Sequence, residues 1–550
     1  MTHDRGAGQQ SRPYATRDLL ITLLGFTALT ALFTYPQILH LTDAIGPDYD
    51  ALFSIWRLAW VGHQLAAQPS ALFDANIFYP ELNTLAYSDA MLLLGLVATP
   101  ALWAGVPPTL IYNLLLLASF IAAGTAMYFC AHSIVSSRTA AWFAGVVFAF
   151  QPYRFAHYSH LELLWTCWIP LALWALHRVI ETGRVKFGVW LGLFIAAQAL
   201  TCLYYAVFLV TALAIVAPFL LIIGRRAGIG TIARATAIGS VCCIAITLPY
   251  AMPYRAAQQA VGHRSFNEVV SWSPSPSSYL TAQDGNWLYP SPTIDKDISE
   301  AVLFPGIALV ALAALGFASR ARKFAGYAAM TVVAFDLSLG ANGLLYPAFY
   351  AMVPPYQGLR VPARIFVIAA AGLCLLGAAG MVALRRFGRI GRIAQHAAIV
   401  AACVEMAGVP LVLQSAPLAT LHTYRWLAEQ PRGVVLEWPL PSASDLGDTE
   451  TPRFMFHSTQ HWQPMVNGYS GNYPASFLRL LSELEGFPSA ESLRVVKARG
   501  VRYLIMHSRG HSQRYANAMI ELMASPEVEW QFAERAGDED IAVFLVRTDE

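Results

Sequence analysis

Hydrophobic residues in this chain gather into long uncharged runs that are separated by short polar stretches. The run 19–40 carries no charge and exceeds the roughly 20 residues with which a helix crosses the hydrocarbon core of a bilayer. The run 187–224 is uncharged over nearly twice that length, so we expect two helices that turn near 202–205. Further spans are expected at about 110–131, 139–152, 162–180, 232–250, 300–318, 325–342, 364–384 and 394–413. The pattern predicts about eleven membrane-spanning helices.

Basic residues set the expected orientation, because loops rich in Lys and Arg stay in the cytoplasm. They precede the first span and recur near 138, 178–186, 225–234, 320–323 and 385–392. These clusters alternate correctly with eleven spans, whereas counting the apolar stretch 89–104 as a twelfth would place them outside. We therefore expect 89–104 to form an interfacial helix that is broken at Pro100 and ended by Pro107-Pro108. The prediction is a cytoplasmic N-terminus (1–18) in a multi-pass protein of the inner (cytoplasmic) membrane.

The composition agrees with a membrane protein and does not suggest a nucleic-acid-binding protein. Of the 550 residues, 56% are hydrophobic and 13% are charged, against about 25% charged in soluble domains. The formal net charge is +2, which gives no reason to expect nucleic acid as a partner. All seven cysteines fall within or at the ends of predicted spans, and none has metal-site spacing, so we interpret them as packing residues.

An acidic cluster follows the first span in the sequence Gly46-Pro47-Asp48-Tyr49-Asp50. It belongs to a first external loop, 40–108, that is predominantly acidic. Apolar residues recur at helical spacing over 51–68, and Trp56 and Trp60 suit a membrane interface. We expect an interfacial helix that begins just after Asp50 and leaves both carboxylates at its N-terminus, where the helix dipole favours their charged form.

Two other regions depart from the hydrophobic pattern. The segment 251–299 is rich in Pro, Ser and aromatic residues, and we interpret it as a second external loop, either a lid over a substrate or a poorly ordered connection. The segment 414–550 alternates strand and helix signals and predicts an external α/β domain. The predicted strands are 433–438, 501–507, 528–534 and 541–547, and the predicted helices are 474–485, 489–499 and 512–523.

A polar cluster is expected at the outer end of the span 139–152. It contains Arg154, His157, His160 and Glu162. The two histidines are three residues apart and could bind a metal on a helix, with Glu162 as a further ligand. The alternatives are that these side chains are polar residues at the membrane interface or that they line a substrate cleft through hydrogen bonds.

Three stretches make the chain resemble a known family. The first is the stretch from Asp48 to Trp60, together with the loop sequences 72–80 and 85–89 that follow it. The second is the pattern Arg360-Val361-Pro362-Ala363-Arg364, and the third is Asn467-Gly468-Tyr469-Ser470-Gly471 in the external tail. The chain resembles the membrane glycosyltransferases of the GT-C superfamily, and within it a bacterial branch of YfhO-like proteins. The resemblance implies a GT-C-like transmembrane domain over 19–413 and inverting transfer of a sugar from a polyprenyl-phosphate donor to an external glycan, lipid or protein.

The resemblance and the required chemistry nominate the same loop. Characterised GT-C enzymes place their catalytic carboxylate there, and Asp48 and Asp50 are the matching positions. Transfer needs a base for the acceptor proton and cations for the leaving phosphate. The alternative role of the two aspartates is to hold a divalent cation, Mg or Mn. The candidate substrate-binding residues are Arg57, Asp74, Asn76, Tyr79, Tyr87, Asp89, Arg154, His157, His160, Glu162, His263, Arg360 and Arg364.

Two other functions remain open on the sequence. A transporter or flippase of a lipid-linked substrate would be expected to show inverted repeats and charges deep in several spans. The charges of this chain concentrate at one face, and its halves are unlike. A non-catalytic GT-C-like scaffold that binds glycan with its external domain is the third hypothesis.

Overall fold

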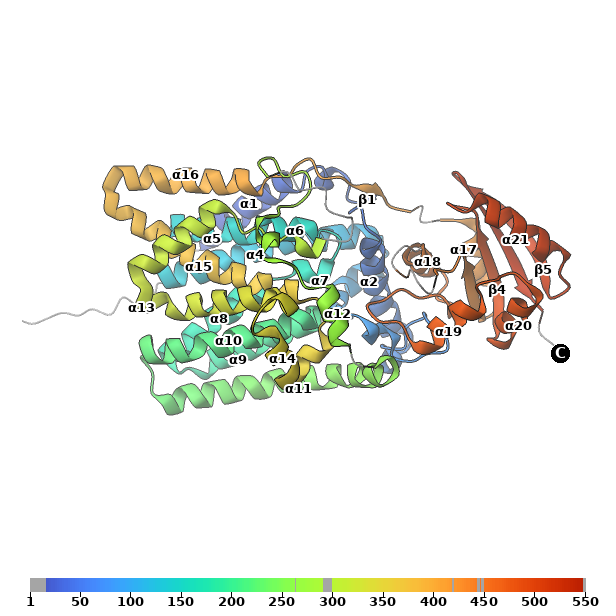
Figure 1. Cartoon of the computed structure of the whole chain (residues 1–550), viewed down its shortest axis with the longest axis horizontal. Coiled ribbons are helices and arrows are strands. Elements are labelled where there is room, and N and C mark those ends of the chain that lie inside the picture. The colour runs from blue at the N-terminus through green and yellow to red at the C-terminus, as the bar shows by residue number, and fades with distance from the viewer. Residues whose placement is uncertain are drawn as a thin grey trace, which may run out of the picture.

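The computed structural model of the chain describes residues 16–547 except 263, 290–298, 418–419, 443–445 and 447–449. Long helices run side by side and form a bundle, and a smaller segment with a β-sheet lies beyond one end of it (Figure 1). The bundle contains α1 (Thr16–Phe33), α4 (Pro108–Val135), α5 (Arg138–Phe150), α8 (Trp168–Thr182), α9 (Val185–Thr201), α10 (Leu203–Ile223), α11 (Ile229–Val261), α13 (Ile307–Ser338), α15 (Phe366–Leu384) and α16 (Gly388–Met406). Every predicted span overlaps one of these helices.

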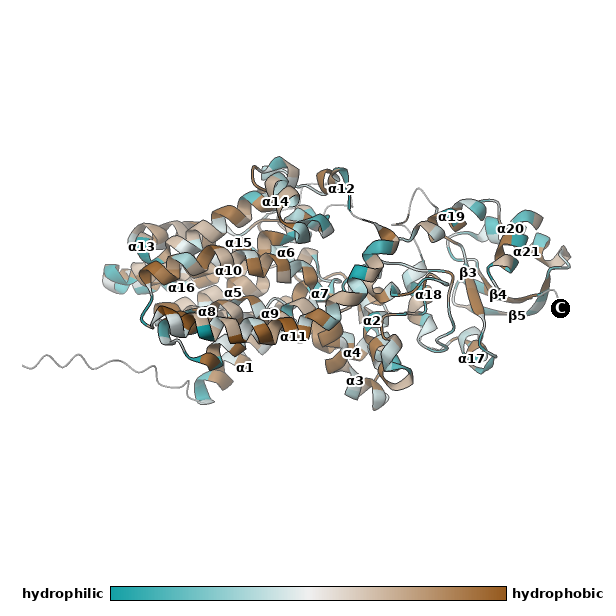
Figure 2. Ribbon diagram, turned by 90° about the horizontal axis from the view of Figure 1, so that it is seen from below, coloured by the Kyte–Doolittle hydropathy of each residue, from teal (hydrophilic) through white to brown (hydrophobic). Residues whose placement is uncertain are grey.

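The helices of the bundle have the length and surface of a membrane protein. Among the described residues, six helical stretches are long and apolar enough to cross a membrane. Outer helices such as α11 expose large apolar side chains, including Val241, Ile244 and Leu248, while α5 and α15 are almost entirely buried. Figure 2 shows hydrophobic residues concentrated along the bundle and hydrophilic ones more frequent in the C-terminal segment. The chain is a multi-pass membrane protein, and its eleven-span count stays a prediction.

Basic turns divide the longest apolar stretches, as the sequence predicted. The helix α13 is interrupted at Arg320, whose backbone angles (φ −146°, ψ 39°) are not helical. Its two arms correspond to the predicted spans 300–318 and 325–342, although the first helical residue is Ile307. Residues 299–301 instead form a short 3-10 turn outside the helix.

Small residues allow two bundle helices to pack closely. Gly188 and Gly192 of α9 face Ala235 and Gly239 of α11, and a Cβ atom on Gly188 would lie 1.9 Å from the carbonyl oxygen of Ala235. A side chain at either glycine would therefore push the two backbones apart. Such spacing of small residues is typical of helices that associate in membranes, where close van der Waals contact supplies much of the attraction.

The first loop differs from its prediction in one respect. Its helix α2 (Tyr49–Ala67) begins where expected, but Trp56 and Trp60 are buried, at 0% and 4% exposure, rather than facing a membrane interface. The helix lies across the end of the bundle, between it and the C-terminal segment (Figure 1). The expectation that the two tryptophans face a membrane interface is wrong, because protein contacts cover them. The location of the helix at the interface stays a prediction.

The stretch 89–104 also differs from its prediction. It forms α3 (Leu92–Trp103), which contains Pro100 instead of breaking there. The helix packs on α2: a Cβ on Gly62 would lie 2.7 Å from Leu102, and the indole nitrogen of Trp103 donates a hydrogen bond to the Gly62 carbonyl oxygen at 2.9 Å. This contact with α2 anchors α3 to the protein.

The C-terminal segment contains a mixed sheet in the order β3-β4-β6-β5, formed by β3 (Val434–Trp438), β4 (Val501–His507), β5 (Val528–Ala536) and β6 (Glu539–Val546). The pair β3–β4 is parallel, and the other two pairs are antiparallel. Its helices are α17 (His422–Glu429), α18 (Thr451–Ser458), α19 (Ala475–Glu483), α20 (Ala490–Ala498) and α21 (Ser512–Ala524). Each strand and helix predicted here lies within a few residues of its expected position.

A two-residue ladder joins the first loop to the start of this segment. The strand β1 (Ala44–Ile45) pairs antiparallel with β2 (Gln414–Ser415). The ladder ends three residues before Asp48, and the Gln414 amide donates a hydrogen bond to the Asp48 carbonyl oxygen at 3.4 Å. The acidic cluster therefore lies where the bundle meets the C-terminal segment.

Candidate active site

Asp48 and Asp50 lie at the N-terminus of α2, as predicted. Asp48 is the N-cap: its backbone is extended, and its side chain accepts a hydrogen bond from the Asp50 N–H at 3.2 Å. Gly46 allows this turn to lie against the segment after α5, because a Cβ there would approach the Ser159 hydroxyl oxygen to 2.5 Å. The close approach brings Asp50 next to His160.

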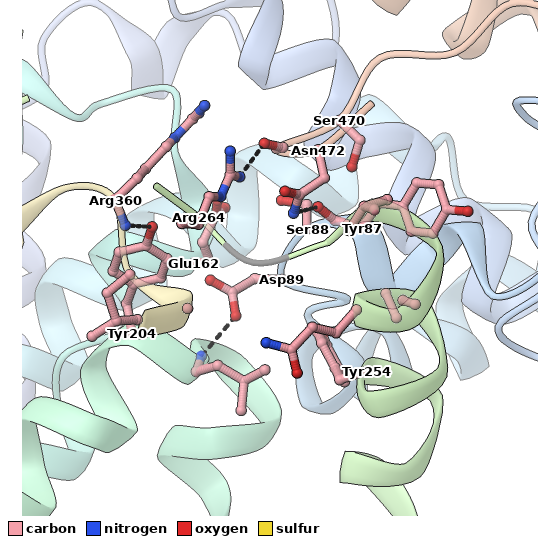
Figure 3. A pocket seen from close by; sticks show the side chains of 18 of the residues that line it. Tyr87, Ser88, Asp89, Glu162, Tyr204, Tyr254, Arg264, Arg360, Ser470 and Asn472 are labelled. Atoms are coloured by element: carbon pink, nitrogen blue, oxygen red, sulfur yellow. Dashed lines mark hydrogen bonds between the residues drawn. The ribbon is translucent and has the colours of Figure 1, made fainter. Parts of the chain in front are cut away.

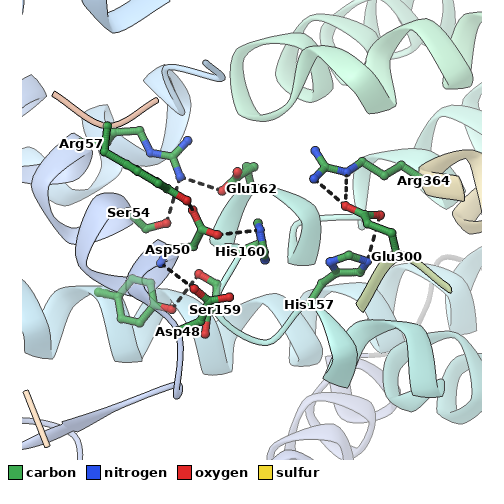
Figure 4. Close-up of polar contacts among 12 residues, drawn as sticks. Asp48, Asp50, Ser54, Arg57, His157, Ser159, His160, Glu162, Glu300 and Arg364 are labelled. Atoms are coloured by element: carbon green, nitrogen blue, oxygen red, sulfur yellow. Dashed lines mark hydrogen bonds and ion pairs between the residues drawn. The ribbon is translucent and has the colours of Figure 1, made fainter. Parts of the chain in front are cut away.

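The carboxylate of Asp50 has a partner on each oxygen, and Figure 4 shows its contact with His160. Its Oδ2 lies 3.0 Å from Nε2 of His160, and its Oδ1 accepts a hydrogen bond from the Tyr469 hydroxyl at 3.2 Å. Although burial opposes ionisation, the neighbouring His160 holds the pKa of Asp50 well below its usual range. Burial also disfavours the imidazolium, but Asp50 raises the pKa of His160 to about 9. At neutral pH the two groups form an ion pair.

Asp48 completes a group of three possible metal ligands. One ligand atom from each of Asp48, Asp50 and His160 lies within 4.8 Å of the others. Partial desolvation, and next the charge of Asp50, raise the pKa of Asp48 above its usual value. Two carboxylates and an imidazole suit a divalent cation such as Mn²⁺, whereas Mg²⁺ prefers oxygen ligands.

Arg57 of α2 links three segments that surround Asp50. Its guanidinium donates to Glu162 at 2.9 Å, to the Ser54 hydroxyl at 2.9 Å and to the carbonyl oxygen of Asp89 at 2.7 Å. It also stacks on the Phe53 ring, and it is 1% exposed. These contacts fix α2 against α7 (Leu161–Leu164) and the end of the first loop.

Asp89 caps a bundle helix and faces the same space. Its Oδ1 accepts a hydrogen bond from the backbone N–H of Leu203, the first residue of α10, at 2.7 Å. Burial, and next the charge of Glu162, raise the pKa of Asp89 to about 6. Its protonation state therefore changes close to neutral pH.

Arg364 is held by a carboxylate that the sequence did not nominate. Its Nε and one terminal nitrogen donate to Oε1 of Glu300 at 2.8 and 2.6 Å. The other oxygen of Glu300 lies 3.4 Å from Nε2 of His157, which is fully buried. The 3-10 turns η5 (Ser299–Ala301) and η8 (Pro362–Ile365) supply Glu300 and Arg364.

A second arginine pair shares one carboxylate. Glu268 of α12 (Phe266–Ser271) accepts a hydrogen bond from Arg264 at 2.5 Å and lies 3.7 Å from Arg360. The Arg360 guanidinium stacks on Trp272, and its backbone N–H donates to the Tyr204 hydroxyl at 2.9 Å. Two cations with one shared anion leave a net positive charge here.

Several of these groups line one cavity of about 530 Å³ (Figure 3). Its wall combines the first loop, the start of α10, the end of α11, the 355–364 segment and the 469–472 loop of the C-terminal segment. Seven predicted site residues line it: Asp50, Tyr87, Asp89, His160, Glu162, Arg360 and Arg364. The cavity therefore places carboxylates and arginines around the same space.

The remaining predicted residues lie elsewhere. Asp48, Arg57 and His157 contact the lining residues Asp50, Glu162 and His160 from outside the wall. Arg154 is buried, where it donates to Thr166 at 2.7 Å. Asp74, Asn76 and Tyr79 do not line the cavity. Asp74 accepts a hydrogen bond from the Asn83 N–H, and Asn76 accepts one from the Trp56 indole, so both hold the first loop together. Tyr79 is 39% exposed. His263 lies outside the described residues.

Sequence reasoning did not assign four residues that the structure brings to the cavity wall or its edge. They are Tyr469, Arg264, Glu268 and Glu300. Tyr469 stood in a motif that was noticed without a role, and Arg264 stood in the second loop. Glu300 gave no local signal, because the hydrophobic run that follows it placed it at the start of a span.

Comparisons with known proteins concern the fold. No protein-family model and no curated protein matches the chain. Among solved structures, the cryo-EM structure of arabinofuranosyltransferase AftD from Mycobacteria matches with a TM-score of 0.63 and 15% identity, over 97% of this chain and 40% of AftD. ArnT from Cupriavidus metallidurans, bound to undecaprenyl phosphate, matches with a TM-score of 0.47 and 12% identity, over 96% of this chain and 98% of ArnT.

The AftD match bears on architecture. It extends over nearly the whole of this chain, which spans less than half the length of AftD. At this low identity the match establishes a shared fold and no shared substrate. The expected fold class is confirmed in part: the chain is a mostly helical, multi-pass membrane protein that shares its fold with AftD, while its span count stays a prediction.

Proposed function

We propose that this protein is a membrane glycosyltransferase that transfers a sugar from a polyprenyl-phosphate donor to a hydroxyl group of a glycan, lipid or protein. The observation that carries the proposal is the shared cavity: the ionised carboxylate of Asp50 faces the same space as Arg264, Arg360 and Arg364. A base and a phosphate-binding group are the two elements that the reaction requires. The AftD-like fold agrees with this class of activity.

The proposed reaction forms one bond and breaks another. The acceptor oxygen attacks the anomeric carbon, with inversion, while the bond from that carbon to the phosphate oxygen breaks. The acceptor proton passes to Asp50, and the polyprenyl phosphate leaves with the bonding electron pair. Arginine side chains stabilise the leaving phosphate because their planar donors match its oxygens.

The ion pair with His160 determines the stage of the reaction at which Asp50 accepts the proton. A carboxylate with a depressed pKa is a weak base towards a neutral hydroxyl. It accepts the proton only once the acceptor oxygen has begun to bond to the anomeric carbon and has become acidic. His160 keeps the carboxylate charged and oriented until that point.

A divalent cation is the alternative role for this group. Asp48, Asp50 and His160 would hold it, and it would supply positive charge for the donor phosphate. His160 must lose its proton to bind a metal, so the cation would compete with that proton, whose pKa is about 9. Metal dependence would then increase from neutral towards alkaline pH.

The test is mass spectrometry of surface glycans in a deletion strain that carries wild type or a variant at equal membrane level. We expect deletion to remove one sugar, and Asp50→Asn to restore it about 10²–10⁴-fold more slowly than wild type, the usual contribution of a general base. Asp43→Asn is the matched control, because Asp43 also pairs with a histidine, His40, at 3.0 Å but is exposed and lies outside the cavity.

Asp48→Asn separates the two roles of the acidic pair. Asparagine caps a helix as well as aspartate does, so a site that uses Asp50 as the base alone retains its activity. A site that needs a cation loses it, and chelation followed by Mn²⁺ or Mg²⁺ addition reveals the dependence. Full restoration of the sugar by Asp50→Asn would contradict the proposal and favour a transporter or a glycan-binding scaffold.

A further inference from the structure

Tyr469 connects the C-terminal segment to the proposed base. It lies 419 residues from Asp50 in the sequence, yet its hydroxyl donates to Oδ1 of that carboxylate at 3.2 Å. Its ring packs edge-to-face on Phe53, one turn further along α2, at 5.4 Å between centroids. The hydroxyl and the ring therefore both contact the first turns of α2.

The loop that carries Tyr469 is anchored on both sides. Asn467 is fully buried and exchanges two hydrogen bonds with the backbone of Glu437 in β3, at 2.7 and 2.8 Å. Its carbonyl oxygen accepts from the Phe78 N–H at 3.0 Å. Beyond Tyr469, the Asn472 amide donates to the Tyr87 carbonyl oxygen at 2.8 Å. The position of the hydroxyl is thus fixed by the sheet and by the first loop together.

Two glycines allow the loop to approach this closely. A Cβ on Gly468 would lie 2.5 Å from the Phe78 ring, and a Cβ on Gly471 would lie 3.3 Å from the Tyr87 carbonyl oxygen. The Gly471 carbonyl oxygen also accepts a hydrogen bond from Arg264. The same six-residue stretch therefore touches Asp50, the first loop and one of the cavity arginines. An accessory domain that only covered the bundle would not require this fit.

We infer that Tyr469 is a positioning residue for Asp50, so that the C-terminal segment supplies part of the active site. The inference rests on the proposed function of Asp50. Tyr469 and His160 hold one carboxylate oxygen each, which stops the carboxylate from rotating where it lines the cavity. Burial, and next the charge of Asp50, keep the pKa of Tyr469 well above its usual value, so the hydroxyl remains a donor.

Removing the hydroxyl has two opposite effects on Asp50. A carboxylate without this donor is a slightly stronger base, because its charged form loses stabilisation. It is also free to rotate out of alignment, and misplacement of a reacting group by about 1 Å costs on the order of a hundredfold in rate. We expect the loss of alignment to dominate.

The experiment compares Tyr469→Phe with Tyr473→Phe, a tyrosine of the same loop region whose hydroxyl donates to the Leu446 carbonyl oxygen and which does not line the cavity. Each variant is tested for the rate at which the sugar reappears on surface glycans after induction, at equal membrane level. Purified protein is tested by native mass spectrometry for binding of undecaprenyl phosphate. A third variant, Gly468→Ala, keeps the Tyr469 hydroxyl but displaces the loop.

We expect Tyr469→Phe to slow the sugar's return about 10- to 100-fold, the range for a hydrogen bond to a charged group, with undecaprenyl phosphate binding unchanged. Gly468→Ala should slow it in the same way, and Tyr473→Phe should not. In an Asp50→Asn background, Tyr469→Phe should add no further loss.

A wild-type or faster rate for Tyr469→Phe would overturn the inference. Loss of undecaprenyl phosphate binding in that variant would also overturn it, because the tyrosine would then act on the donor or on folding. If Asp50→Asn abolishes transfer while Tyr469→Phe does not affect it, the proposed function stands and only the inference fails. If Asp50→Asn is itself fully active, the proposed function fails.

Discussion

Two clusters of carboxylates, histidines and arginines lie in this protein, and they differ in how completely their charges are paired. The sheet cluster consists of Glu437, Arg453, His507 and Glu539, in the core of the C-terminal segment. His507 lies 2.8 Å from Glu437 and 2.7 Å from Glu539, and Arg453 reaches both oxygens of Glu539 at 2.6 and 2.8 Å. All four residues are at most 5% exposed, and none lines the cavity.

The cavity cluster consists of Asp50, Asp89, His160, Glu300 and Arg364. The side chains of Asp50 and His160 remain 19% and 16% exposed, and Glu300 binds only two of the three nitrogens of Arg364. An unpaired buried charge is costly, and in the sheet cluster each positive side chain contacts a carboxylate. This pairing favours a structural role for the sheet cluster. The cavity cluster leaves charge available for a ligand. Residue types alone do not distinguish the two clusters, but their access to the cavity does.

The largest effect should come from breaking the sheet cluster. Arg453→Met leaves Glu539 without its bidentate partner, so we expect the free energy of unfolding of the C-terminal segment to fall by about 3–5 kcal/mol. Hydrogen exchange at the β4 and β6 amides measures this loss. Arg479→Met, at an exposed position on α19, is the control. Unchanged protection in Arg453→Met would show that this cluster contributes little to stability.

Asp89 should make the stability of the cavity cluster depend on pH. Burial raises its pKa from 3.8 to about 6, so its contribution to stability is fully present below pH 3.8 and is lost as pH rises through about 6. That difference of about 2 pKa units corresponds to at most about 3 kcal/mol. We expect Asp89→Asn to flatten the fall in melting temperature between pH 4 and 7. Asp74→Asn, in the same loop but outside the cavity, should leave that fall as it is in wild type.

The ion pair between Asp50 and His160 should weaken at alkaline pH. Because Asp50 raises the pKa of His160 from 6.5 to about 9, the pair contributes stability that is present below pH 6.5 and lost as pH rises through 9. Partial exposure screens the pair, so we expect a loss of about 1–2 kcal/mol. Melting temperatures between pH 7 and 10 measure it. His160→Gln should abolish the dependence, whereas the exposed His422→Gln should retain it; a slope that persists in His160→Gln would refute this assignment.

The smallest effect concerns the charge on Arg364. Glu300→Gln keeps an acceptor for the guanidinium but removes one negative charge beside the cavity, so undecaprenyl phosphate should bind about threefold to fivefold more tightly, a change of about 1 kcal/mol. Native mass spectrometry with a lipid titration measures the affinity. Glu483→Gln, exposed on α19, is the control. Weaker binding in Glu300→Gln would mean that the ion pair matters for the orientation of Arg364 more than for its charge.

Much of the architecture was determined by local sequence. The spans follow from uncharged runs, the interruption of α13 at Arg320 follows from a basic turn, and the strand β4 (Val501–His507) has its predicted bounds. The helix that begins beside Asp50 was also predicted, because its apolar residues recur at helical spacing, and the structure adds that Asp48 is its N-cap. These features depend on neighbouring residues and on the hydrophobic effect, which short segments of sequence record.

Only the tertiary structure decided which side chains meet. The sequence nominated His160, Arg360 and Arg364 for substrate binding, but it gave Asp74, Asn76 and Tyr79 the same role, and these three do not line the cavity. It could not show that Tyr469 reaches Asp50 across 419 residues, or that Glu300 leaves its predicted span to hold Arg364. Contacts between distant segments depend on how complete helices and loops pack, and a local pattern carries no record of that packing. The chain thus specifies its elements locally, while the candidate site exists only once the bundle, the first loop and the C-terminal segment have come together.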